Sequence, residues 1–235
     1  MSCARKTLPL IALALAVPVA GAEGQARAAE RDAMVAHIVR QGVRDSATLA
    51  AMRRVPRHEF VPREHGARAY GDHPLPIGYG QTISQPYIVA YMTELLRPRP
   101  GMKVLEVGTG SGYQAAVLAA TGADVYTVEI FEVLAVQARD RLERLKYAGV
   151  RVRHADGHFG WTDAAPFDAV IVTAAAGYIP PALVEQLRPG GRMMIPVGSV
   201  YGIQNLILLE KDAEGQVTTR ALLPVRFVPM LQGLR

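Results

Sequence analysis

Short apolar runs follow one another at regular intervals through the second half of the chain. Runs with the length and composition of strands are predicted at residues 103–107, 124–128, 150–154, 167–173, 192–196, 204–211 and 217–226. Helical spacing is predicted between them at residues 112–120, 132–146 and 180–187. Strands that alternate with helices predict a parallel sheet with both faces covered. We therefore expect a Rossmann-like, doubly wound α/β fold with a mostly parallel seven-stranded sheet, plus an N-terminal helical extension.

The first hundred residues have a less regular pattern. Helical spacing is predicted at residues 34–40, 47–55 (with Ser46 as the N-cap) and 87–96, whereas residues 23–33 have no apolar period and are expected to form a linker. Residues 56–82 are rich in Pro, Gly, His and Arg and also have no sustained period, and a segment of that length is usually functional. We expect residues 34–100 to form a helical, substrate-side segment. Together with a Rossmann-like core at 101–235, it would make one domain over 34–235.

The extreme N-terminus has the pattern that is typical of an export signal. Arg5 and Lys6 precede an apolar run from Leu8 to Ala20, and the run ends in Ala-Gly-Ala at residue 22. Because this run is short for a membrane span, we expect cleavage of residues 1–22 and no stable membrane insertion. The alternative is that Met34 is the true first residue.

Composition narrows the class of protein. Half of the 235 residues are apolar, which is enough for one domain with a single core. The net charge of +5 is spread along the chain without a basic block, so nucleic acid is not an expected partner. The single cysteine, Cys3, precedes the body of the protein, and the six histidines lack metal-ligand spacing. We therefore expect no disulfide framework, no cysteine nucleophile and no metal.

A glycine-rich turn carries the strongest chemical signal. The predicted strand 103–107 leads directly into Gly108, Gly110 and Gly112, and a helix follows without a break. Glycines permit positive φ and let backbone N–H groups approach a ligand closely. Glu129 ends the next strand, 21 residues after Gly108, where a carboxylate can accept hydrogen bonds from both hydroxyls of a ribose. This arrangement predicts a site for a cofactor that contains adenosine.

The acids beside the turn favour a cationic cofactor. Glu106 lies two residues before the first glycine and would repel a pyrophosphate, whereas S-adenosyl-L-methionine carries a sulfonium and an ammonium and no phosphate. Asp156 follows the third strand and could reach the adenine amino group. The Gly-x-Gly-x-Gly spacing also differs from the dinucleotide fingerprint. A nicotinamide-dependent oxidoreductase is the disfavoured alternative.

Five stretches together closely resemble the protein-L-isoaspartate O-methyltransferases, which are class I S-adenosylmethionine-dependent enzymes. The stretches are residues 80–86 (Gly-Gln-Thr-Ile-Ser-Gln-Pro), 104–113, 154–157, 166–169 and 226–229. The resemblance runs from about Met34 to about Leu231. It implies methyl transfer from S-adenosyl-L-methionine to the α-carboxylate of L-isoaspartyl residues in damaged proteins and peptides. The ester would then form a succinimide, whose hydrolysis partly restores L-aspartate.

The resemblance also implies roles for individual residues. The implied catalytic residues are Ser84 and Thr82. The implied cofactor-binding residues are Gln81, Ile83, Glu106, Gly108, Thr109, Gly110, Ser111, Gly112, Glu129, Ile130, Asp156 and Gly157. The implied substrate-binding residues are Thr173, Ala174, Ala175, Val228 and Pro229. The expected products are the methyl ester and S-adenosyl-L-homocysteine, and a monomer is expected.

The chemistry suits hydroxyl side chains at the acceptor. A carboxylate nucleophile is already ionised at neutral pH, so alignment and exclusion of water matter more than a general base. We expect Ser84 to orient the carboxylate and Thr82 to assist, with no covalent intermediate. The alternative for Ser84 is an ordinary helix cap before Pro86. A signal-like front is unusual for a family generally found in the cytosol, so a non-catalytic or differently specific S-adenosylmethionine-binding protein is the alternative function.

Overall fold

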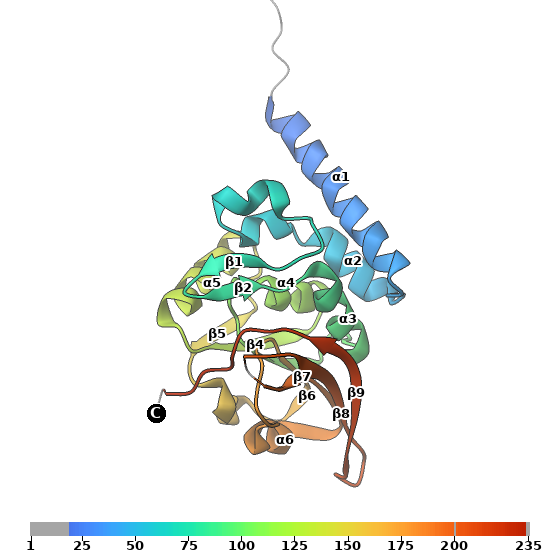
Figure 1. Ribbon diagram of the computed structural model, residues 1–235, viewed down its shortest axis with the longest axis vertical. Coiled ribbons are helices and arrows are strands. Elements are labelled where there is room, and N and C mark those ends of the chain that lie inside the picture. The colour runs from blue at the N-terminus through green and yellow to red at the C-terminus, as the bar shows by residue number, and fades with distance from the viewer. Residues whose placement is uncertain (1–18, 200, 234–235) are drawn as a thin grey trace, which may run out of the picture.

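The computed structural model describes residues 19–199 and 201–233, and its centre is a seven-stranded sheet in the order β5-β4-β3-β6-β7-β8-β9 (Figure 1). The strands are β3 (Lys103–Val107), β4 (Asp124–Glu129), β5 (Arg151–His154), β6 (Phe167–Val172), β7 (Leu187–Gly198), β8 (Gln204–Lys211) and β9 (Val217–Val225). The pairs from β5 to β7 are parallel, whereas β8 pairs antiparallel with both β7 and β9. The predicted mostly parallel, Rossmann-like sheet is confirmed.

Helices cover the two faces of the sheet unequally. The described helices are α1 (Val19–Arg40), α2 (Ser46–Arg54), α3 (Pro86–Leu96), α4 (Tyr113–Ala120), α5 (Glu132–Arg144) and α6 (Pro181–Gln186). Alternate residues of the parallel strands point to opposite faces, so Val104 joins a core with α1 to α4 while Leu105 joins a second core with α6. Both faces of the central strands are therefore buried.

Residues 23–33 are helical rather than a linker. They belong to α1, in which Met34, Val35 and Ile38 are buried against the rest of the protein. The residues before Met34 are mostly exposed, so their Ala, Arg and Glu side chains give no apolar period, although each has a high helix propensity. Most of the predicted export signal, residues 1–18, lies outside the described residues. Within the described ranges, no helix has the length and apolar character that crossing a membrane requires.

The cap of α2 differs by one residue from the prediction. Asp45, not Ser46, is the N-cap, and its carboxylate accepts a hydrogen bond of 2.7 Å from the backbone N–H of Thr48. Asp is as good an N-cap as Ser, and here its oxygen reaches the third residue of the helix.

Residues 56–82 contain short elements that no apolar period revealed. They form the 3₁₀ helices η1 (Arg57–Phe60) and η2 (Arg63–Arg68) and the hairpin of β1 (Leu75–Gly78) and β2 (Gln81–Ile83). The hairpin turn uses positive φ at Tyr79 and Gly80, as tight hairpins require.

A buried arginine fixes this segment to the core. Arg57 is fully buried, and its Nε donates to the carbonyl of Ala69 at 2.8 Å. Its guanidinium also lies 4.9 Å from the centre of the Tyr113 ring, at the start of α4. Burial lowers the pKa of Arg57 from its ordinary value, and the nearby Tyr113 opposes that shift. The segment is thereby held against the helix that follows the glycine turn.

The strand predicted at 192–196 is longer in the structure. β7 begins at Leu187, opposite Phe167, but its next partner pair is Ala169 with Arg192. The residues between Leu187 and Arg192 therefore bulge out of the ladder, and Gly190 has a positive φ of 76° there. Residues 189–191, between the predicted helix at 180–187 and the predicted strand at 192–196, therefore lie inside a bulged strand.

Candidate active site

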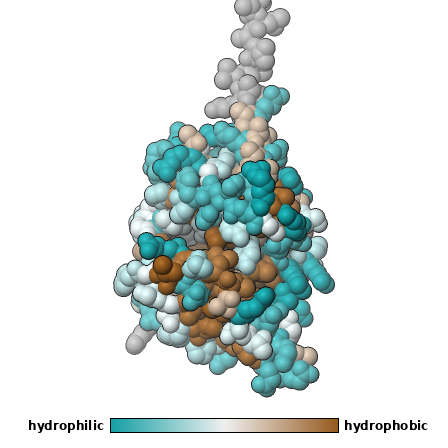
Figure 2. Space-filling model, turned by 45° about the vertical axis from the view of Figure 1, so that its right-hand side comes forward, coloured by the Kyte–Doolittle hydropathy of each residue, from teal (hydrophilic) through white to brown (hydrophobic). Residues whose placement is uncertain are grey.

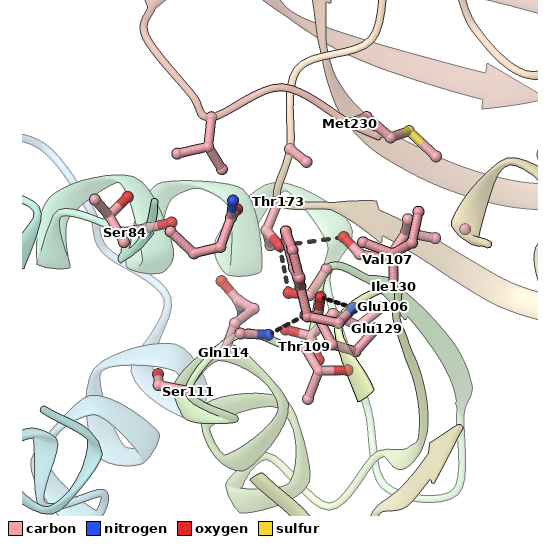
Figure 3. Close-up of a pocket in the computed structure, with 18 of the residues that line it drawn as sticks. Ser84, Glu106, Val107, Thr109, Ser111, Gln114, Glu129, Ile130, Thr173 and Met230 are labelled. Atoms are coloured by element: carbon pink, nitrogen blue, oxygen red, sulfur yellow. Dashed lines mark hydrogen bonds between the residues drawn. The ribbon is translucent and has the colours of Figure 1, made fainter. Parts of the chain in front are cut away.

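A pocket of about 740 Å³, including its mouth, lies at the carboxyl ends of β3, β4 and β6. Ligands bind at this edge in open parallel sheets. Figure 3 shows Glu106, Thr109 and Glu129 on its sheet side, with Ser84 and Met230 on other sides. All but three of the residues predicted for the site line this pocket; the exceptions are Gly112, Asp156 and Ala175.

Close packing explains the glycines at two positions. Gly108 has φ of 97°, and a Cβ there would lie 2.6 Å from the Thr173 hydroxyl. That hydroxyl donates to the carbonyl oxygen of Gly108 at 2.7 Å. Thr173, predicted to touch substrate, therefore also holds the first peptide of the glycine turn. At the opposite side, a Cβ on Gly157 would lie 2.3 Å from Val107 Cγ1, so only glycine fits there without a shift.

Glu129 joins the glycine turn to the end of β4. Its Oε2 accepts a hydrogen bond of 2.7 Å from the backbone N–H of Gly110, and its Oε1 accepts one of 3.0 Å from that of Phe131. Each carboxylate oxygen has a further lone pair, so both oxygens can still accept from hydroxyl groups of a ligand. The carboxylate is thus held in place beside the pocket with capacity for two more donors.

Glu106 is the most perturbed group of the pocket. It is fully buried, and its Oε2 has no hydrogen-bond partner. Burial raises the pKa of this carboxyl to about 8, and the neighbouring Glu129 adds to the shift. Among the described residues that line the pocket, none is Lys, Arg or His. The pocket therefore provides negative charge for a cation and no basic group for a phosphate.

The three residues outside the pocket support it from behind. Asp156 accepts from the backbone N–H groups of His158 at 2.9 Å and Gly233 at 3.1 Å. Burial raises the pKa of Asp156, but these bonds and the His158 side chain outweigh it, so the pKa lies below its ordinary value. Gly112 packs against α5, and Ala175 forms a backbone pair with the segment at Val228.

Thr82 and Ser84 lie where two hollows of the surface meet. Both residues line the pocket above and a second groove of about 1,220 Å³. Figure 2 shows hydrophobic residues gathered on one face of the molecule. Several of the residues that line the groove are also apolar. Its remaining lining residues are Gln41, Pro74, Gln85, Tyr87, Ile88, Ile203, Leu223, Pro224, Val225, Arg226 and Phe227.

The helix-cap alternative for Ser84 does not hold in the structure. The N-cap of α3 is Gln85, with Pro86 in the first turn, and no side chain of the cap residue bonds the helix. Ser84 lies one residue before the cap and is half-buried beside the two hollows. Ser84 therefore borders both hollows and does not cap α3.

Several pocket residues escaped prediction. They are Val89, Val107, Tyr113, Gln114, Val128 and Phe131. Met230 and Leu231 also line the pocket, and they belong to the end of the chain that the family resemblance implies beside the substrate. Gln114 had a usable signal, because it is the one amide in the otherwise apolar helix Tyr113–Ala120, and it donates to Thr93 at 2.9 Å. The apolar members had no signal of this kind, since a pocket wall and a core residue look alike in sequence.

The chain is similar to known proteins over most of its length. Residues 29–235 match the family described as Protein-L-isoaspartate(D-aspartate) O-methyltransferase (PCMT). A relative from Polaromonas sp. (strain JS666 / ATCC BAA-500), named Protein-L-isoaspartate O-methyltransferase 2, is 60% identical over 186 residues, covering 79% of this chain and 88% of the relative. Another from Cupriavidus necator, named Protein-L-isoaspartate O-methyltransferase 1, is 50% identical and covers 98% and 94% of the two chains.

Two solved structures share the fold. One, described as a protein-L-isoaspartate O-methyltransferase, has a TM-score of 0.79 and 28% identity, and covers 87% of this chain and 67% of its own. The other, from Plasmodium falciparum, has a TM-score of 0.75 and 24% identity over 86% of this chain and 99% of its own. That protein was solved in complex with S-adenosyl-L-homocysteine.

Proposed function

This chain belongs to the protein-L-isoaspartate O-methyltransferase family, and we propose that it repairs damaged polypeptides. It would move a methyl group from S-adenosyl-L-methionine to the α-carboxylate of an L-isoaspartyl residue. The ester would cyclise to a succinimide, and hydrolysis of the succinimide would partly restore L-aspartate. No observation favours a non-catalytic binding protein over this reading.

The first pocket suits this cofactor by its charge. Glu106 and Glu129 supply two carboxyl groups, and the buried Oε2 of Glu106 has no partner within the protein. An ammonium or sulfonium would give that oxygen a favourable charge to face. The pyrophosphate of a dinucleotide would instead meet two acids and no basic side chain among the described lining residues. The acidic lining of the pocket therefore disfavours the alternative of a nicotinamide-dependent oxidoreductase.

The junction at Thr82 and Ser84 carries the proposal. One hollow has the acids and glycines for the cofactor, and the neighbouring groove is larger, open and partly apolar. An extended polypeptide could lie in that groove with its isoaspartyl carboxylate directed toward the first pocket. We propose that Arg226 and Tyr87 contact residues that flank the damaged site, while Thr173, Ala174, Val228 and Pro229 border the acceptor. Both hollows come from one chain, so we propose that a monomer is active.

The side chains at the junction would align the acceptor rather than activate it. When bound, S-adenosyl-L-methionine supplies an electrophilic methyl group, and the acceptor carboxylate is already ionised at neutral pH. Ser84 and Thr82 can each donate one hydrogen bond to that carboxylate. The β1–β2 hairpin and the segment at Met230 would exclude water, which stabilises the separated charges of the reactants more than the transition state.

The test is a methyl-transfer assay with the purified protein. Labelled S-adenosyl-L-methionine is supplied with two peptides that differ only in L-isoaspartate or L-aspartate at one position. We expect base-labile label on the isoaspartyl peptide alone. If cofactor binding is intact and neither peptide is labelled, the acceptor assignment is wrong and the binding-protein alternative gains support.

We also propose that residues 1–22 direct export. The order of two basic residues, an apolar run and Ala-Gly-Ala supports this proposal. Mass spectrometry of the protein from its own cells should find an N-terminus at Glu23. An N-terminus at Met34 would show instead that translation starts there and that the protein has no export signal.

A further inference from the structure

Asp72 lines neither hollow, but four polar groups surround its carboxylate, three of them from residues that line the groove. Its Oδ2 accepts from the side-chain amides of Gln41 at 2.7 Å and Gln85 at 2.9 Å, and its Oδ1 accepts from the backbone N–H of Tyr87 at 2.9 Å. The imidazole Nε2 of His37 lies 3.3 Å from Oδ2. This single carboxylate therefore connects the end of α1 and the start of α3 with the segment that leads into the β1–β2 hairpin.

The carboxylate is charged and mostly buried. Only 16% of its side chain is exposed. Burial raises the pKa of Asp72, but the bonds from Gln85, Gln41 and Tyr87 outweigh it, and the pKa lies below its ordinary value. Hydrogen bonds to a buried carboxylate are stronger than those between neutral groups. The cluster is therefore a firm connection rather than a surface contact.

Asp72 performs the capping that the α3 cap residue does not. Gln85 is the N-cap but makes no side-chain bond to the helix, so the N–H of Tyr87 would lack a partner without Asp72. A negative charge at a helix N-terminus is also favourable to the helix dipole. Asp72 holds both the amide of Gln85 and the backbone of Tyr87, and Ser84 is the next residue before Gln85. The position of Ser84 is thereby tied to Asp72.

We propose that Asp72 is a positioning residue that fixes the segment Thr82–Ser84 between the two hollows. The inference rests on the proposed function, because Ser84 is taken to orient the acceptor carboxylate. A displacement of about 1 Å at such a position can lower turnover by as much as about 100-fold. Asp72 itself does not line the cofactor pocket or the groove.

The test compares Asp72→Ala with a matched variant, Asp45→Ala. Asp45 caps α2 through the N–H of Thr48 in the same way, but it lines neither hollow. We expect Asp72→Ala to lower kcat for the isoaspartyl peptide by about 10- to 100-fold, with the dissociation constant for S-adenosyl-L-homocysteine changed by less than about threefold. Asp72→Asn keeps an oxygen for Tyr87 and should retain more activity. Asp45→Ala should lower the melting temperature and leave kcat unchanged.

A second measurement does not depend on turnover. Amide hydrogen exchange at residues 82–87 should accelerate by about tenfold or more in Asp72→Ala and stay as in the native protein in Asp45→Ala. Unchanged exchange there, or a kcat that matches the Asp45→Ala variant, would overturn the inference. If the native protein fails to methylate the peptide, the proposed function is wrong, and the exchange measurement still decides whether Asp72 holds the segment.

Discussion

Glu106 carries a proton at neutral pH before a cofactor binds, because burial raises its pKa to about 8. A bound cation would favour the ionised form, so binding below pH 8 would release a proton. We therefore expect the affinity for S-adenosyl-L-methionine to increase about fivefold from pH 7 to pH 8 and about tenfold in all, levelling off above about pH 9. Calorimetric titrations at several pH values, in buffers of different ionisation enthalpy, would measure both the affinity and the proton release.

Glu106 should lower the stability of the unliganded protein at alkaline pH while it strengthens cofactor binding. A carboxyl whose pKa is raised on folding stabilises the fold below its unfolded pKa of 4.5, and that contribution is lost as the pH rises toward 8. Glu106→Gln should therefore raise the melting temperature of the unliganded protein at pH 8.5 relative to the native protein. It should also weaken cofactor binding and remove the pH dependence. A variant with native affinity and native pH dependence would show that Glu106 does not face the cation.

Ser84 can be tested against a serine with no role in the site. Ser84→Ala should lower kcat by about 10- to 100-fold, since it removes a donor that aligns the acceptor, while the affinity for S-adenosyl-L-homocysteine stays within about threefold. The control is Ser46→Ala at the exposed start of α2, which should keep native kinetics. Full-rate turnover by Ser84→Ala would remove Ser84 from the mechanism.

At the level of elements, η3 (Gly157–Phe159) packs closely against the end of β3 at the pocket, where Gly157 and Val107 both line it. A Cβ on Gly157 would overlap Val107 Cγ1, and the backbone of β3 is fixed by strands on both sides. Gly157→Ala should cost about 1–3 kcal/mol of stability and weaken cofactor binding. The double variant Gly157→Ala with Val107→Ala should recover part of both losses, because the second change removes the overlapping methyl group. Thermal melts and cofactor titrations of the native protein, the two single variants and the double variant would measure this coupling.

For the whole molecule, local chemistry made the sheet and the glycine turn predictable. Gly108 and Glu129 could be found because each follows an apolar strand and has a residue type that its position requires. The start of α1 was missed because exposed residues leave no apolar period in a helix formed largely by propensity. Asp72 was missed because its partners, His37, Gln41 and Gln85, are distant in sequence and meet only after folding.

Within residues 19–199 and 201–233, the two outer strands of the sheet, β5 and β9, have one edge each without a partner strand (Figure 1). Such edges can pair with other chains and start aggregation, and charged residues or proline suppress this. On β5, Arg151 and Arg153 are exposed, and on β9 an exposed Pro224 lacks a donor N–H. A repair enzyme would work among partly unfolded, damaged chains, where an unprotected edge would recruit its own substrates.

Replacing both β5 arginines by valine should therefore promote aggregation while leaving the pocket intact, because neither side chain lines it. Light scattering during refolding, in the presence of a partly unfolded protein, should rise well above that of the native enzyme. Valine at the exposed Arg53 and Arg54 of α2 removes the same charge from a helix and should have little effect. Equal scattering by the two variants would mean that lost charge alone, rather than the strand edge, controls aggregation. With its arginines in place, the β5 edge would not pair with exposed strands of misfolded substrates. The enzyme could therefore bind and release these substrates without aggregating with them.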